Sequence, residues 1–82
     1  MTIDVKFNSS ELADRLRSGA YDLPEGATVE YLIGIAQKEA GFALSQELMG
    51  NLVFLYENRH AVLQTVMDKS GKLRVLHKVM GG

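Results

Sequence analysis

The sequence contains no cysteine, no tryptophan, only one proline and no long apolar run. Without cysteine the chain has no disulfide, no thiolate nucleophile and no thiolate metal ligand. No apolar stretch approaches the roughly 20 residues of a membrane-spanning helix. The first seven residues alternate apolar with polar side chains, unlike the core of a signal peptide. We therefore expect a cytoplasmic protein that has no membrane partner.

A strong charge of one sign is also absent. Nine lysines and arginines stand against ten aspartates and glutamates, which gives a net charge of −1. Nucleic acids attract strongly basic proteins, so we expect no nucleic-acid partner. One local bias remains, a basic cluster late in the chain that is either a solvated face or a patch attracting an acidic partner. Its members are Lys69, Lys72, Arg74 and Lys78.

Patterns typical of enzymes and metal sites are missing. The two histidines, His60 and His77, are 17 residues apart, so they form no His-x-x-x-His pair. No serine lies in a Gly-x-Ser-x-Gly elbow, and no glycine-rich phosphate loop is present. We expect no catalytic residue, no metal site and no intrinsically bound cofactor, so the chain is not expected to be an enzyme.

The first half of the chain predicts two strands and two helices. Residues 2–8 alternate apolar with polar side chains and predict a strand with one buried face. Ser9-Ser10 predicts the start of one or two helical turns that end at Gly19, and a short antiparallel strand follows over 20–23. A long helix is expected between Thr28 and Gly41, because its apolar residues recur on one face. These residues are Val29, Leu32, Ile33, Ala36 and Ala40.

The second half predicts mostly strands. Ser45 predicts the cap of a short helix that reaches Met49. The apolar run over 52–56 predicts a central strand covered on both faces. The remaining segments predict a polar turn, a short strand or edge segment, a second turn and a final strand, over residues 57–60, 62–66, 68–71 and 72–79.

This order of elements predicts an α+β protein. One long amphipathic helix must lie across a mixed sheet of four to five strands to bury both apolar faces. With the first and last strands parallel at the centre, the arrangement is a ubiquitin-like β-grasp. We expect residues 1–82 to form a single β-grasp domain, in which residues 77–82 are an extended, flexible C-terminal Gly-Gly tail.

The end of this predicted tail, Gly81-Gly82, is the part suited to chemistry. Two glycines without Cβ atoms make a thin segment that can enter a narrow tunnel in another protein. Seven residues follow Val75 and reach about 23 Å when extended. A carboxylate on this tether becomes an acyl donor once a partner adenylates it with ATP, after which sulfide, thiol or amine can displace AMP. A frayed terminus is the alternative interpretation.

Three segments together resemble the small ubiquitin-like sulfur carriers, the family of the molybdopterin synthase small subunit and the thiamine-biosynthesis sulfur carrier. Residues 23–32 read Leu-Pro-Glu-Gly-Ala-Thr-Val-Glu-Tyr-Leu and are similar to the entry into that family's helix. Residues 53–59 are similar to its buried strand and polar turn, and 68–82 to its last turn, last strand and Gly-Gly. Asn58-Arg59 stands where the family usually has Asn-Gly.

The resemblance implies a carrier cycle. A ubiquitin-activating-type adenylating enzyme uses ATP to convert the Gly82 carboxylate to an acyl-adenylate. A sulfur donor protein then supplies persulfide sulfur to make the thiocarboxylate, and a synthase subunit accepts it in molybdopterin-type or related cofactor biosynthesis. Gly81 is expected to thread the tunnel. The expected partner contacts are Met80, Val79, Lys78 and Arg74.

Two other functions stay open at this point. A protein modifier would use the same Gly82 carboxylate to form isopeptide bonds with lysines of target proteins. A β-grasp binding module would carry the tail without using it.

Overall fold

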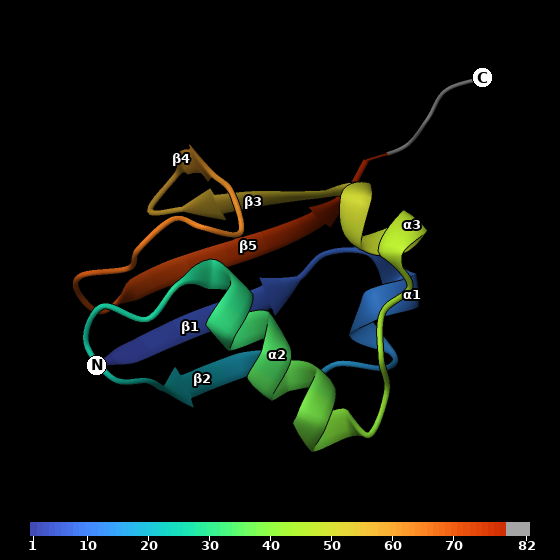
Figure 1. Cartoon of the computed structure of the whole chain (residues 1–82), viewed down its shortest axis with the longest axis horizontal. Coiled ribbons are helices and arrows are strands. Elements are labelled where there is room, and N and C mark those ends of the chain that lie inside the picture. Colours follow the sequence, from blue (N-terminus) through green and yellow to red (C-terminus); the bar gives the residue numbers. More distant parts are fainter. Residues whose placement is uncertain (79–82) are drawn as a thin grey trace.

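The computed structural model describes residues 1–78 and contains a five-stranded mixed sheet in the order β2-β1-β5-β3-β4 (Figure 1). β1 and β5 are parallel neighbours, and every other pair of adjacent strands is antiparallel. This is the predicted β-grasp arrangement, which is confirmed. The elements are β1 (Thr2–Phe7), α1 (Ser10–Ala13), β2 (Gly19–Asp22), α2 (Val29–Ala40), α3 (Gln46–Gly50), β3 (Leu52–Tyr56), β4 (Arg59–Ala61) and β5 (Gly71–His77).

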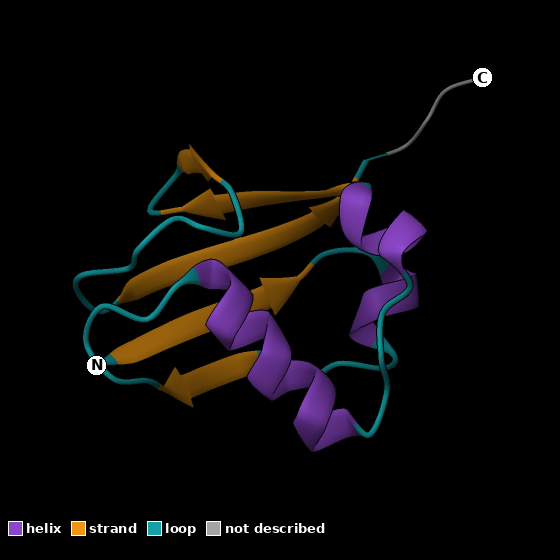
Figure 2. Cartoon of the chain, in the orientation of Figure 1, coloured by secondary structure: helices purple, strands orange, loops and turns teal. Residues whose placement is uncertain are grey.

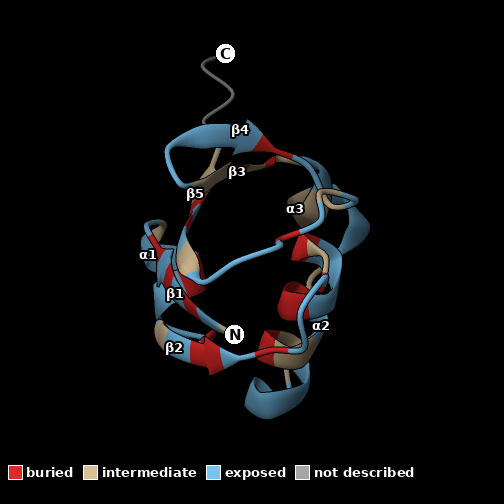
Figure 3. Cartoon of the chain, turned by 90° about the vertical axis from the view of Figure 1, so that its left-hand side faces the viewer, coloured by how far each residue is buried: buried red, intermediate tan, exposed pale blue. Residues whose placement is uncertain are grey.

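The core lies between one face of the sheet and α2 (Figures 2 and 3). Alternate residues of β1 are buried, as the alternating pattern predicts, while the intervening ones are exposed. α2 contributes Val29, Leu32, Ile33 and Ala36, all at most 1% exposed. The helix buries these side chains because they recur every three or four residues and so share one face.

Two of the three predicted helix caps form. At α1 the Ser9 side chain makes no cap hydrogen bond, and the predicted end of this helix at Gly19 was wrong, because α1 ends at Ala13 and Gly19 begins β2. The Thr28 hydroxyl accepts a hydrogen bond from the Tyr31 backbone N–H at 3.1 Å, and Ser45 accepts one from Leu48 in the same way. At the other end of α2, Gly41 adopts the left-handed conformation with φ 63°, which favours glycine. Local side-chain chemistry therefore sets these boundaries.

The prediction for the β3–β4 hairpin was wrong in its boundaries. The polar turn contains only Glu57 and Asn58, whose φ values of 51° and 65° give the two-residue geometry that matches strand twist. Arg59–Ala61 then forms β4, and residues 62–66 are not a strand of the sheet. Glu57 keeps its unusual conformation because its carboxylate accepts from the Lys72 backbone N–H at 2.9 Å, a contact distant in sequence.

Residues 62–66 instead form a loop against the start of α2. The Val29 and Glu30 N–H groups donate to carbonyl oxygens of this loop, at 3.1 and 2.9 Å. The first N–H groups of a helix have no partner within the helix, so an outside acceptor satisfies them. This tertiary requirement outweighs the strand propensity of the segment.

The predicted coverage of β3 on both faces was also wrong. β3 lies between β5 and β4, and only Leu52 and Phe54 are buried. Val53 and Leu55 alternate with these buried residues, so they point to the other face of the sheet, where they are half-buried. The apolar run therefore supplies both the core and an outward-facing apolar strip.

Candidate functional site

The end of β5 is where the predicted tail leaves the domain. β5 continues through His77, and the Lys78 backbone N–H donates to the Asn51 carbonyl at 2.6 Å. The domain thus holds the chain up to Lys78, one residue beyond the predicted start of the tail at position 77. The other predicted tail residues, Val79, Met80, Gly81 and Gly82, lie outside the described residues.

Two shallow hollows flank the end of β5. One, of about 290 Å³, lies between α1 and α3 and is lined by Glu11, Ser45, Glu47, Leu48, Asn51 and His77. The other, of about 240 Å³, is lined by Asn8, Ser9, Leu76 and His77. His77 lines both hollows, so it lies between the hollow next to α1 and α3 and the hollow next to the end of β1.

The face of the sheet opposite α2, named here the outer face, lies next to the end of β5. Leu76 and Arg74 point to this face, because they alternate with the buried Val75 and Leu73. Leu76 lies opposite Val53, and Arg74 lies opposite Leu55 on β3. Val53, Leu55 and Leu76, named here the outer strip, form three neighbouring apolar side chains beside the start of the tail.

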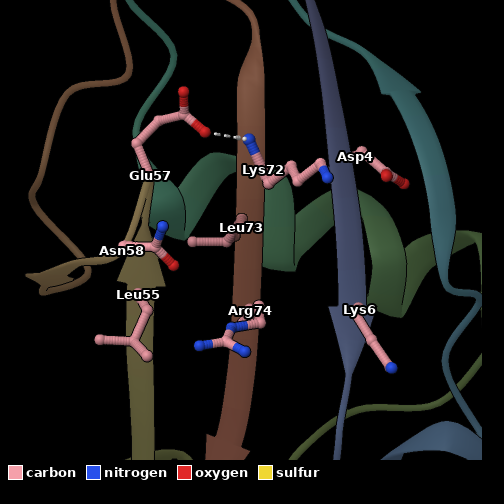
Figure 4. A pocket seen from close by; sticks show the side chains of 8 residues that line it. All are labelled: Asp4, Lys6, Leu55, Glu57, Asn58, Lys72, Leu73 and Arg74. Carbon is pink, nitrogen blue, oxygen red and sulfur yellow. Dashed lines mark hydrogen bonds between the residues drawn. The ribbon is translucent and has the colours of Figure 1, made fainter.

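A hollow of about 350 Å³, named here the sheet hollow, lies beside the outer strip (Figure 4). Strands β1, β5 and β3 and the hairpin turn all contribute to it. Three cations and two carboxylates are among its lining residues, which are Asp4, Lys6, Leu55, Glu57, Asn58, Lys72, Leu73 and Arg74.

The structure divides the predicted basic cluster. Lys72 and Arg74 line the sheet hollow, whereas Lys69 lines a separate hollow beside β4 and Lys78 lies just after the end of β5. Sequence reasoning missed Lys6, which lies opposite Arg74 in the parallel pairing of β1 with β5. The alternation of apolar and polar residues in the first strand could have predicted Lys6, because it places this side chain on the polar face of the strand.

The three side chains whose pKa values are shifted, Arg17, Tyr21 and Glu39, lie together away from the outer face. The Arg17 guanidinium donates to Glu39 at 3.0 Å and lies over the Tyr21 ring. The hydrogen bond from Arg17 lowers the pKa of Glu39 and raises that of Arg17, while burial raises the pKa of Tyr21. This group joins the loop before β2 to the last turn of α2, so its role is structural.

This ion pair predicts a small pH effect on stability. The lowered pKa of Glu39 means that its contribution is present above its ordinary value near 4.5 and is lost as pH falls through the folded value. Because both side chains are more than 40% exposed, the effect is small and salt-sensitive. Glu39→Gln should lower the melting temperature slightly at pH 7, and the difference should shrink as the pH falls below the ordinary glutamate value and the carboxylate becomes protonated. Glu25→Gln, in the exposed turn before α2, is the control. A difference that stays the same or grows as the pH is lowered would contradict this account.

Within residues 1–78, no three histidine, aspartate or glutamate side chains come together as a possible metal site. Among the helices of that range, none has the length and apolar character to cross a membrane.

No protein-family model and no curated protein matches the chain. Several solved structures do. SAMP1 from Haloferax volcanii is 20% identical with a TM-score of 0.76, and the match covers 100% of both chains. A putative molybdopterin converting factor, subunit 1, from Pyrococcus furiosus is 17% identical with a TM-score of 0.72, covering 96% of this chain and 99% of the other.

A second structure of the H. volcanii protein, described as small archaeal modifier protein 1, is 16% identical with a TM-score of 0.72, and the match covers 95% of this chain and 98% of that one. At these identities the likeness establishes the fold. The predicted resemblance to ubiquitin-like sulfur carriers is confirmed at the level of the fold, since the neighbours include a small archaeal modifier protein and a putative molybdopterin converting factor subunit. Both the carrier and the modifier interpretation fit these neighbours.

Proposed function

We propose that this chain is a ubiquitin-like sulfur carrier that works through the carboxylate of Gly82. The observation that carries the proposal is a β-grasp domain whose central strand β5 ends at His77, four and five residues before Gly81 and Gly82 in the sequence. The shared fold with the P. furiosus converting factor subunit supports the carrier function and a molybdopterin-type or related pathway.

In the proposed cycle, partner enzymes supply the catalytic groups. The Gly82 carboxylate attacks the α-phosphorus of ATP on an adenylating enzyme of the ubiquitin-activating type, and pyrophosphate leaves. The terminal sulfur of a donor-protein persulfide then attacks the carbonyl carbon, and AMP leaves. A second thiol of the donor cleaves the resulting acyl disulfide, which releases the thiocarboxylate and leaves a disulfide on the donor. A synthase subunit accepts the sulfur. The chain itself has no cysteine for any of these steps.

The short tether restricts how a partner approaches. Measured from Val75 the tail would reach about 23 Å, but the backbone bond of Lys78 leaves four residues up to Gly82, or about 14 Å when extended. An enzyme that holds Gly82 in its active site must therefore touch the domain around the end of β5. This places Leu76, Arg74 and Lys78 within the expected contact area.

Mass spectrometry tests the carrier proposal. Incubated with ATP, its adenylating enzyme and a persulfide donor, the chain should gain about 16 Da at Gly82, because one oxygen is exchanged for sulfur. Tandem fragmentation should locate the gain in the last residue. The reaction without ATP is the control and should leave the mass unchanged. A chain that is adenylated but never gains this mass would contradict the proposal.

A protein modifier is the second candidate. It is favoured by the match to SAMP1, which covers both chains completely. A modifier would form isopeptide bonds between Gly82 and target lysines, giving a ladder of heavier species in cells that express a tagged chain. Loss of that ladder on deletion of Gly82, with target lysines carrying a Val-Met-Gly-Gly remnant after trypsin cleaves the tail at Lys78, would establish this function.

A further inference from the structure

We propose that the open edge of β3 at Leu52 is a docking site for a short, uncharged, extended segment of a partner protein. In this contact the backbone of the segment pairs with Leu52, and one apolar side chain of the segment enters the hollow beside it. The site lies at an edge of the sheet and not on its outer face. The proposal goes beyond the proposed function, because it depends on neither the tail nor Gly82.

β4 covers only part of β3. Its three residues pair with Phe54, Leu55 and Tyr56, whereas β5, on the other side, pairs with β3 from Leu52 to Tyr56. β4 therefore stops short of the first two residues of β3 (Figure 1). An unpaired length of strand presents its N–H and C=O groups to any strand that approaches it.

The backbone groups of Leu52 are directed at this open side. The N–H and C=O groups of an antiparallel strand point to alternate sides from one residue to the next. The Asn51 carbonyl and the Glu57 N–H both form bonds toward the β5 side, at 2.6 and 2.9 Å, so odd-numbered positions in and beside β3 face β5. Even-numbered positions face β4. Phe54 and Tyr56 pair there, and Leu52 directs the same two groups past the end of β4.

The residue that would complete this pairing is held elsewhere. The register of β3 with β4 pairs Phe54 with Ala61, so a longer β4 would place Leu63 opposite Leu52. Instead the Leu63 carbonyl accepts a hydrogen bond from the Glu30 N–H at 2.9 Å, at the start of α2. The first N–H groups of a helix need such an acceptor from outside the helix, which keeps Leu63 from pairing with β3.

A hollow of about 230 Å³ lies next to Leu52, between α3 and the loop that follows β4. Six of its eight lining residues are apolar, and these are Met49, Leu52, Phe54, Ala61, Val62 and Leu63. None of the eight is an aspartate, glutamate, lysine or arginine, in contrast to the sheet hollow and the hollow between α1 and α3. Val62 is 49% exposed, so an apolar occupant would remove apolar surface from water. The charge and polarity of the lining therefore favour an uncharged, apolar occupant.

The pairing geometry defines that occupant further. A residue paired with Leu52 directs its side chain to the same face of the sheet as Leu52, toward the hollow. That residue is therefore apolar, as leucine, valine or methionine is, and its own N–H and C=O complete the pairing. α3 ends two residues before Leu52, and the pairing with β4 begins two residues after it, so an extended segment has room for about three residues.

Hydrogen exchange tests whether this edge is open. In the free chain the Leu52 amide should exchange at least about tenfold faster than the Phe54 amide, because Phe54 pairs with β4 and Leu52 does not. Equal protection of the two amides would mean that the edge is already occupied, and this result would overturn the proposal.

A peptide titration followed by NMR tests the docking itself. The probe is acetyl-Thr-Leu-Thr-amide, and saturable changes of amide shifts should be centred on Leu52 and residues 61–64. Two control peptides carry N-methyl-leucine or aspartate at the central position. Both should bind at least about fivefold more weakly, because the first lacks the N–H donor and the second places a charge in an apolar hollow. Equal binding of the probe and both control peptides would overturn the proposal.

Two variants of the chain give the matched comparison. Val62→Asp should weaken binding of the probe at least about fivefold, because the carboxylate lies at the hollow. Val66→Asp makes the same change at an exposed valine of the same loop that does not line the hollow, and it should leave binding within about twofold. Urea denaturation should show that both variants stay folded, since both side chains are exposed. No saturable binding, binding centred on the outer face, or equal weakening by the two variants would overturn the proposal.

Discussion

Deletion of Gly82 is expected to abolish sulfur loading while leaving the free energy of unfolding unchanged within about 0.5 kcal/mol. The buried core and the backbone hydrogen bonds described for the domain involve residues up to Lys78. The deletion moves the reacting carboxylate to Gly81, about 3.5 Å back along the tether. A displacement of even 1 Å can reduce a reaction about 100-fold, so we expect no measurable thiocarboxylate.

Two measurements on the same preparation check this expectation. Urea denaturation gives the free energy of unfolding, and mass spectrometry after incubation with ATP, adenylating enzyme and sulfur donor gives the loaded fraction. Gly82→Ala is the matched variant: it keeps the carboxylate and the tether length but adds a Cβ, so loading should slow without a change in stability. A deletion variant that loads normally would contradict the carrier function. A large loss of stability would contradict a tail that is separate from the core.

Removal of Gly81 and Gly82 together also distinguishes a β-grasp binding module from a carrier or a modifier. A β-grasp binding module with an idle tail would keep its biological activity in this variant, whereas a carrier and a modifier would both lose theirs. The carrier and the modifier are then separated by the product formed at Gly82, a thiocarboxylate or an isopeptide bond.

Replacement of Phe54 by alanine is expected to destabilise the domain by about 3–5 kcal/mol. Phe54 is 4% exposed and packs in the core between the sheet and α2, so its truncation leaves a cavity. The total stability of a domain is about 5–15 kcal/mol, which makes this one of the largest effects available from a single substitution. Leu32→Ala, at a position with 0% exposure, should cost about 2–5 kcal/mol for the same reason.

The neighbouring residue on β3 is the matched control. Leu55 is also apolar and lies one position further along, but it points to the outer face and is half-buried. Leu55→Ala should cost about 1 kcal/mol or less, and it should weaken partner binding. Urea denaturation of both variants at equal protein concentration gives the comparison. Equal losses of stability would contradict the assignment of the two residues to opposite faces of the sheet.

Much of the fold was predictable because it depends on local patterns. Alternation in β1 and the recurring apolar residues of α2 each specify which face is buried, whatever the rest of the chain does. Thr28, Gly41 and Ser45 mark helix boundaries through hydrogen bonds or backbone conformations that involve only neighbouring residues. The limits of β4 were not predictable in this way, since they depend on a contact between Glu57 and Lys72, 15 residues apart.

The same division applies to the candidate site. The sequence by itself determined β1, α2 and the start of α3, and it contains the Gly81-Gly82 segment on which the proposed function depends. It predicted the parallel pairing of the first and last strands but not their register. Only the tertiary structure decided that Lys6 lies opposite Arg74, and that Val53, Leu55 and Leu76 adjoin one another on an open face. The physical reason is that strand register joins residues distant in the chain, and that an apolar run does not reveal which of its faces a helix will cover.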